Sequence, residues 1–182
     1  TGSTIPYYWV MSKNKDLTFT PKLYTNENAL FLNEYRQAFR NGFLTLDTSY
    51  QEGYKNTSSK KTEGSRNHIF ANLDLNFGKE EISNSSLNIK IQRTSNDTYF
   101  RVHNINTTLV DSENTNLENE IAYNFSKSDM NLDIKANVFE NLTVDDSARY
   151  EYILPNITYG KNFFNESLGT FDFTSNAYYS NY

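Results

Sequence analysis

Apolar and polar residues alternate with a period of two along most of this chain. The clearest run is 87–92, where Leu87, Ile89 and Ile91 alternate with polar residues. Successive side chains of a β-strand point to opposite faces, so each run predicts a strand with one apolar and one polar face. Comparable runs lie at 16–23, 44–50, 68–77, 117–125, 132–138 and 171–179, and only Phe70 interrupts the alternation of 68–77. The pattern predicts about 10–11 antiparallel strands and no segment with a helical period.

The predicted strands are long. Each run extends over about 10–13 residues, whereas strands of globular proteins most often have about 5–6. A tilted strand that crosses a bilayer needs about 9–11 residues, and strands cross lipid only as a closed sheet. We therefore expect an all-β fold, an antiparallel up-and-down transmembrane β-barrel of which this chain forms part. A soluble secreted β-sandwich, such as an adhesin or a glycan-binding module, would show the same alternation and is the alternative.

Turn-forming residues separate the predicted strands. Asn41-Gly42 is the strongest two-residue hairpin signal. Ser95-Asn96-Asp97 and Lys127-Ser128-Asp129 predict short connections, and residues 55–65 predict a longer polar loop.

The composition fits exposed apolar faces better than a conventional core. Hydrophobic residues are 37% and aromatic residues 15% of the chain, an unusual pairing for a soluble or a disordered protein. The net charge of -5 makes nucleic acid an improbable partner. The chain has no cysteine, so these residues form neither a disulfide nor a thiolate metal site.

The sequence offers little support for catalysis. His68 and His103 are isolated, with no acid or hydroxyl at motif spacing, and Asp145-Asp146 falls in a predicted loop. No metal-ligand cluster and no glycine-rich phosphate loop is visible. We expect no catalytic residues, no metal and no cofactor, and therefore a protein that is not an enzyme.

Charged residues follow the polar positions of the predicted strands and would face a barrel lumen. The strongest candidates are Asp16, Lys22, Glu34 and Arg36, followed by Asp47, Asp74, Lys90, Glu118, Glu120, Asp133 and Lys135. Most are expected to form a lumen wall with charge pairs between neighbouring strands. Glu34 and Arg36 are two residues apart and so face the same way.

Two of the three prolines, Pro6 and Pro21, fall in the first two predicted strands. Proline lacks the backbone donor of a ladder hydrogen bond and is normally found at strand edges or bulges. They either mark strand starts or bulges, or leave the first strand poorly paired, as a seam that opens would require.

Five short motifs, in order, resemble the barrel of the LptD family of lipopolysaccharide-assembly proteins. They are Ile5-Pro6-Tyr7-Tyr8-Trp9, Asp16-Leu17-Thr18-Phe19-Thr20-Pro21-Lys22, Glu34-Tyr35-Arg36, Asp97-Thr98-Tyr99-Phe100-Arg101 and Arg149-Tyr150-Glu151-Tyr152-Ile153-Leu154-Pro155. The residues that carry the match best are Tyr7, Tyr8, Trp9, Tyr99, Phe100, Leu154 and Pro155.

The resemblance implies a large outer-membrane barrel of about 26 strands, at the upper end of the common range. Residues 1–182 would be one segment, the first strands of that barrel, without the family's jelly-roll domain and closing strands. Pro6 and Pro21 would weaken the lateral gate through which lipopolysaccharide enters the outer leaflet of a Gram-negative bacterium. The implied partners are lipopolysaccharide, a plug lipoprotein similar to LptE and, through the jelly roll, a periplasmic bridge protein similar to LptA. A passive, porin-like barrel is the alternative within membranes.

Overall fold

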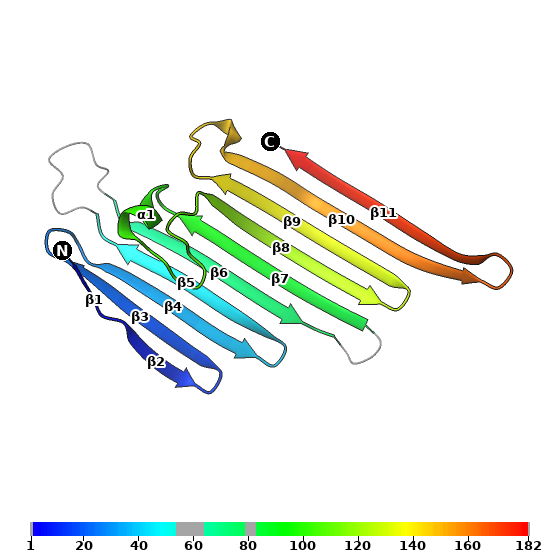
Figure 1. The fold of residues 1–182 in the computed structure, drawn as a ribbon, viewed down its shortest axis with the longest axis horizontal. Coiled ribbons are helices and arrows are strands. Elements are labelled where there is room, and N and C mark those ends of the chain that lie inside the picture. Colours follow the sequence, from blue (N-terminus) through cyan, green and yellow to red (C-terminus); the bar gives the residue numbers. More distant parts are fainter. Residues whose placement is uncertain (1, 54–63, 79–82, 182) are drawn as a thin grey trace. The chain divides into compact units, whose positions relative to one another are not determined.

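The computed structural model describes residues 2–53, 64–78 and 83–181. Within these ranges the chain forms eleven strands, one five-residue α-helix and one short 3-10 helix (Figure 1). The strands are β1 (Gly2–Thr4), β2 (Tyr7–Ser12), β3 (Lys15–Tyr24), β4 (Leu30–Phe39), β5 (Gly42–Gln51), β6 (Arg66–Asn76), β7 (Ser83–Thr94), β8 (Asn116–Lys127), β9 (Met130–Asn141), β10 (Tyr150–Asn165) and β11 (Gly169–Asn181). The helices are α1 (Tyr99–His103) and η1 (Ser147–Arg149).

The described strands make one open antiparallel sheet whose neighbours follow the order of the sequence. β1 and β2 both pair with β3, so they are two halves of a single edge strand, and β11 is the last strand in the order. The all-β, antiparallel prediction and its strand number are confirmed. Closure of the sheet into a barrel stays a prediction.

Strands β3 to β11 contain 10 to 16 residues each. This agrees with the long runs of alternation in the sequence and exceeds the usual length of globular strands. Among the described residues, no helix is both long and apolar enough to cross a membrane.

The chain divides into two compact units. The first contains Thr1–Asn72 and Ile91–Thr115, and the second contains Leu73–Lys90 and Asn116–Tyr182. Each is described by itself.

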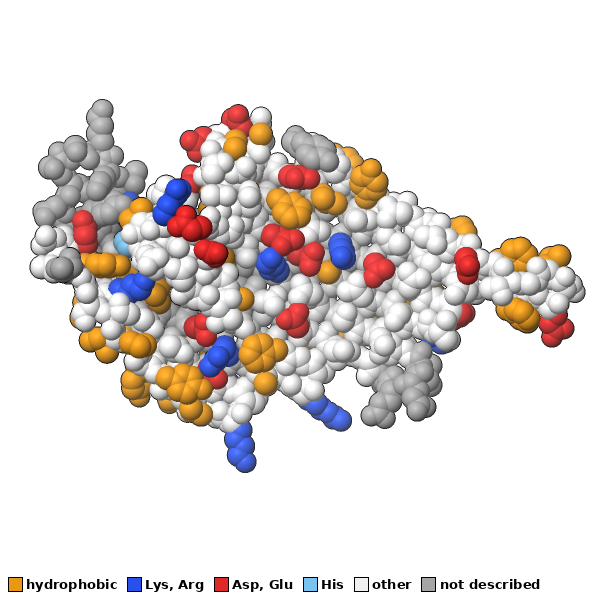
Figure 2. All heavy atoms as spheres, viewed as in Figure 1, with side chains coloured by type: hydrophobic (Ala, Val, Ile, Leu, Met, Phe, Trp, Pro, Cys, Tyr) orange, Lys and Arg blue, Asp and Glu red, His pale blue; other side chains and the backbone are white. Residues whose placement is uncertain are grey.

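The sheet of the first unit has one apolar and one polar face. On the apolar face, the register places Leu17 opposite Tyr35 and Tyr35 opposite Leu46. The large side chains that this face leaves exposed include Trp9, Leu23, Phe31, Tyr50 and Ile69. Asp16, Arg36 and Thr45 occupy successive opposed positions on the polar face, where acidic and basic side chains lie interspersed (Figure 2).

Residues 95–115, which we call the covering segment, join β7 to β8 and pack on the polar face of the first unit (Figure 1). The segment includes α1. Together with three residues of the sheet it forms a small apolar core: Leu30, Leu32, Phe70, Tyr99, Phe100, Ile105 and Val110 are all buried. The prediction of a short turn at Ser95-Asn96-Asp97 is therefore wrong, because the connection continues into a packed segment.

The second unit repeats the two-faced pattern. The register places Leu87 opposite Tyr123 and Ile121 opposite Ala136 on the apolar face, and Lys90 opposite Glu120 on the polar face. Large apolar side chains stay exposed on the apolar side of its strands, among them Ile121, Tyr152, Phe163, Phe171 and Phe173.

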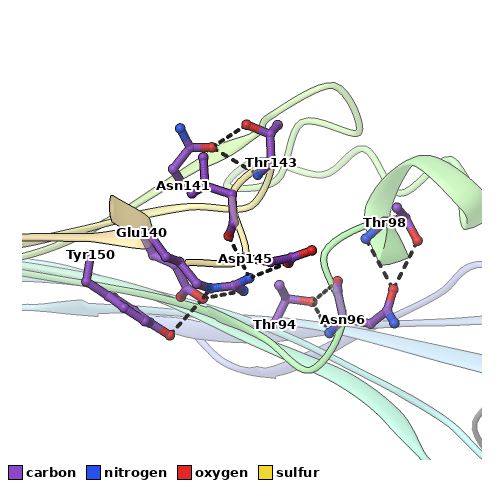
Figure 3. A network of polar contacts seen from close by, with 10 residues as sticks. Thr94, Asn96, Thr98, Glu140, Asn141, Thr143, Asp145 and Tyr150 are labelled. Carbon is purple, nitrogen blue, oxygen red and sulfur yellow. Dashed lines mark hydrogen bonds and ion pairs between the residues drawn. The ribbon is translucent and has the colours of Figure 1, made fainter. Parts of the chain in front are cut away.

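The connections agree with the sequence in part. β8 ends at Lys127 and β9 begins at Met130, so the predicted turn at 127–129 is confirmed. Asn41 lies in the β4–β5 turn and Gly42 begins β5. Asp145-Asp146 lies in the β9–β10 connection as predicted. Beside this connection, Glu140 of β9 accepts a hydrogen bond from Tyr150 and pairs with Arg149 (Figure 3). Most of the predicted 55–65 loop lies outside the described residues.

Candidate functional site

The two N-terminal prolines lie next to each other across the first two strand positions of the sheet. Pro6 does not lie inside a strand, as the sequence suggested, but in the break between β1 and β2. Pro21 lies within β3. The registers on either side of the break, Thr4 with Lys22 and Tyr7 with Phe19, place Ile5 opposite Pro21.

Each proline removes a different ladder bond. The Ile5 amide donates to the Pro21 carbonyl oxygen at 3.2 Å, and in an antiparallel ladder such a pair normally exchanges two bonds. Pro21 has no amide hydrogen with which to return the second bond. The neighbouring residue, Pro6, then directs its nitrogen away from β3, towards the free edge. The pairing of the edge strand with β3 therefore lacks one bond, and Pro6 offers no donor on the outer side of that strand.

The aromatic motif after Pro6 forms β2. Tyr7 and Trp9 lie opposite Phe19 and Leu17 on the apolar face, whereas Tyr8 lies opposite Thr18 on the polar face. Tyr7, Tyr8 and Trp9 are each more than half exposed. At the other end of the chain, Leu154 and Pro155 occupy the point where the pairing of β10 with β9 and β11 shifts register, so the third proline marks a bulge.

Charged residues on the polar faces pair across strands as predicted. Arg36 Nε lies 2.8 Å from Asp16 Oδ1 and 3.8 Å from Glu34 Oε1. In the second unit Lys90 Nζ lies 2.5 Å from Glu118 Oε2. The structure contains cross-strand ion pairs of the expected kind, Arg36 with Asp16 and Lys90 with Glu118; the lumen wall stays a prediction.

Lys22, at a polar-face position of β3, anchors the covering segment. Its ammonium group donates to the carbonyl oxygens of His103 at 3.2 Å and Asn104 at 3.1 Å. These carbonyls end α1, where Asn104 has a left-handed backbone with φ of 46°, so the lysine satisfies helix-terminal acceptors. Glu34 supplies a second anchor by accepting from Thr108 Oγ1 at 2.8 Å.

Beneath α1 lies a buried polar chain from Tyr99 to Asp47. The Tyr99 hydroxyl lies 2.7 Å from Ser49 Oγ, which lies 2.5 Å from His68 Nδ1. His68 Nε2 lies 2.9 Å from Asp47 Oδ1, and the side chains of His68 and Asp47 are 0% and 1% exposed. The expectation that His68 is isolated is wrong: its acid and hydroxyl partners come from the adjacent strand β5, which no sequence spacing reveals.

Serine, histidine and aspartate in hydrogen-bond contact are the residue types of a nucleophilic relay. Here the serine hydroxyl is buried and already bonded to Tyr99, so no substrate atom reaches it while the covering segment is seated. In the tautomer whose Nε2–H donates to Asp47, Nδ1 accepts from Ser49 Oγ, which in turn accepts from Tyr99. The arrangement is suited to holding α1 on the sheet.

Burial shifts the pKa of two groups in the covering segment. Desolvation raises the pKa of Tyr99 to about 12. The pKa of His103 is lowered, first by burial and then by the positive charges of Arg66 and Lys22. Both groups are therefore neutral near pH 7.

Two hollows lie on the polar faces. One of about 300 Å³ borders the covering segment in the first unit, lined by residues that include Thr18, Thr20, Lys22, Glu34, Asp47 and Thr107. A groove of about 390 Å³ in the second unit is lined largely by amides and hydroxyls, among them Asn76, Asn84, Ser86, Asn124, Ser126 and Asn131. The described part of the chain contains no cluster of three or more metal-ligating side chains.

The covering segment is the main feature that the sequence analysis missed, although one signal pointed to it. Phe70 interrupts the alternation of β6, and Leu30 and Leu32 occupy polar-face positions of β4. Apolar residues at such positions on neighbouring strands indicate that something apolar covers that face. Phe100, Ile105 and Val110 supply the partner surface.

Comparison with known proteins provides no identification. No protein-family model matches the chain, and no curated protein matches it.

Proposed function

We propose that this chain is part of a laterally gated outer-membrane β-barrel that moves lipopolysaccharide into the outer leaflet of a Gram-negative bacterium. The membrane part of the proposal rests on one observation: each unit exposes an apolar face that carries large aromatic and aliphatic side chains. A water-soluble protein rarely leaves so much contiguous apolar surface uncovered, whereas lipid is a suitable solvent for it.

The transport part rests on the edge strand together with the sequence motifs that resemble LptD. Pro6 lies in the edge strand and Pro21 lies in β3 beside it. Pro21 therefore lacks a donor towards the edge strand, and Pro6 lacks one on the outer side of that strand. A passive porin does not open between two of its strands, so a weakened pairing at one strand would serve no purpose in it. A barrel that releases lipid-linked cargo sideways needs a seam that opens at low cost.

The proposal includes the two partner proteins that the resemblance to LptD implies. A plug lipoprotein similar to LptE would contact the polar faces, where charged side chains and hollows lie. A bridge protein similar to LptA would act through a jelly-roll domain outside these residues.

The gate is tested by restoring the missing donors. In the complete protein, Pro21→Ala restores the amide that would bond Ile5, and Pro6→Ala adds an amide on the outer side of the edge strand. Each amide contributes about 0.5–1.5 kcal/mol once bonded. A stronger seam opens less often, so the rate at which new lipopolysaccharide becomes accessible at the cell surface falls several-fold. Pulse labelling followed by a surface-impermeant probe measures this rate.

The third proline provides the matched control. Pro155→Ala changes the same residue type at the β10 bulge, away from the seam, and leaves the export rate unchanged. Export at the parental rate in the Pro6, Pro21 double variant contradicts the gate and leaves a passive barrel as the better account.

A further inference from the structure

Both histidines of the chain lie beneath or within the covering segment. The ring of Tyr99 is 6.2 Å from the ring of His68 and 5.2 Å from that of His103. Histidine is the side chain whose ordinary pKa, about 6.5, lies closest to neutrality. Two of them gathered at one packed contact make that contact a candidate for control by pH.

The seated position of His103 disfavours the protonated ring. Its Nδ1 has one partner, the Tyr24 hydroxyl at 3.4 Å. Its Nε2 is buried and has no hydrogen-bond partner within the described residues. An imidazolium needs an acceptor for each of its two N–H groups, so protonation would leave a charged donor unsatisfied in a buried place.

The charges around His103 act in the same direction. From β3, Lys22 donates to the carbonyl oxygen of His103 itself, and the Tyr24 hydroxyl lies 3.4 Å from His103 Nδ1. From β6, Arg66 adds a second cation. The ring of His68, which is bonded to Asp47 of β5, lies against the ring of Tyr99, and Tyr99 in turn lies against His103. Glu27, between β3 and β4, is the nearby carboxylate that opposes the two cations. On α1 itself, Arg101 is exposed.

We propose that the covering segment is a pH-controlled latch, seated on the polar face of the first unit when His103 is neutral and released when His103 takes up a proton. The proposal does not depend on lipopolysaccharide transport. Release would expose Leu30, Leu32 and Phe70 and open the hollow beside Lys22 and Asp47 to the rest of the polar face. The latch therefore determines when this face is accessible to another molecule.

The sign of the pH effect follows from linkage. The pKa of His103 is lower in the seated state than the ordinary value that the released segment would have. The released state therefore binds more protons, and the seated state loses stability as pH falls below about 6.5. Above that pH the seated state keeps its full stability. One proton changes the ratio of released to seated protein by at most about tenfold per pH unit.

The test measures exposure of the buried side of the segment as a function of pH. In a cysteine-free background of the complete protein, Ile105→Cys places a thiol at a position that is 0% exposed, and Val102→Cys places one on the exposed side of the same segment. We take the ratio of the maleimide labelling rate at position 105 to that at position 102. Because pH changes the reactivity of both thiols, this ratio reports the exposure of position 105. Between pH 7.5 and pH 5.5 we expect this ratio to rise several-fold.

Two variants assign the effect to His103. His103→Gln cannot take up the proton, so its ratio stays flat across this pH range. His68→Gln removes bonds to Ser49 and Asp47, so it increases labelling at every pH but keeps the pH dependence. A flat ratio in the parent, or a persistent rise in His103→Gln, overturns the proposal.

A measurement on the unsubstituted protein covers the case in which His103→Gln releases the segment at every pH. The two histidine rings are followed by NMR with ring-labelled histidine, and His103 is assigned by its loss in the variant. We expect it to titrate below pH 6.5. Titration at or above that pH overturns the latch.

Discussion

At the scale of single residues, the polar chain under α1 shows how a buried hydroxyl stabilises a contact between segments far apart in the sequence. Tyr99, Ser49 and His68 come from the covering segment, β5 and β6, and each finds its hydrogen-bond partner on another of these elements. A buried polar group that loses its partner is destabilising by about 1–3 kcal/mol. The network therefore favours one position of α1 over others of similar apolar contact.

Removing one hydroxyl tests this network. Tyr99→Phe keeps the ring packing but removes the hydroxyl that bonds Ser49 Oγ. We therefore expect the free energy of unfolding to fall by about 1–2 kcal/mol. Denaturant unfolding followed by tyrosine fluorescence measures the change. Tyr150→Phe is the control, because the Tyr150 hydroxyl also bonds a side chain, Glu140 at 3.0 Å, but the residue is exposed. Equal losses in the two variants would contradict a special role for the buried network.

At the scale of elements, the strands were predictable and the covering segment was not. Alternation over long runs is a local signal, and it located β3, β5, β7, β8 and β9 because side chains on a strand must alternate between faces. The segment at 95–115 has no such period, and its burial depends on contacts with Ser49 and His68. Only the register of β4, β5 and β6 brings these residues to one place. In the same way, Pro6 and Pro21 could be identified from the sequence, but the side on which each lacks a donor required the pairing of Ile5 with Pro21.

The apolar contact of α1 yields a prediction at this scale. Phe100 is 2% exposed and packs against Phe70 and His68, with ring centroids 5.3 and 5.4 Å away. Phe100→Ala removes a buried aromatic side chain, a change that typically costs about 3–5 kcal/mol. Amide hydrogen exchange at residues 99–110 should accelerate strongly, while exchange in β9 and β10 stays as it is.

Val102→Ala is the matched control for this prediction. It shortens a side chain of the same helix that is 61% exposed, so exchange in the covering segment should stay within about twofold of the parent, as is usual for surface substitutions. Fast exchange in both variants would contradict a specific role of Phe100 in holding α1, because alanine at position 102 does not lower the helix propensity.

At the scale of the whole molecule, the account depends on where the apolar faces lie. In each unit a set of exposed aromatic and aliphatic side chains, such as Trp9 and Phe31 in the first and Ile121 and Tyr152 in the second, lies on the face opposite the charge pairs. Period-two alternation predicted this division, since it requires only the pleat of a strand. It could not decide between lipid and a second sheet as the partner of the apolar face, because both bury the same residue types. The central claim is therefore that lipid, rather than a second sheet, covers the apolar face.

The most direct test is a scan of β9 with single spin labels in the complete protein reconstituted into lipid vesicles. Leu132, Ile134, Ala136 and Val138 alternate with Asp133, Lys135 and Asn137 along this strand. The account predicts that labels at the first set collide mainly with oxygen, which dissolves in lipid, and labels at the second set mainly with a water-soluble nickel chelate. If oxygen accessibility and nickel-chelate accessibility both alternate from residue to residue, with one high where the other is low, the strand lies between lipid and water. Low accessibility to both reagents at the apolar positions would place them in a protein core and contradict the membrane account.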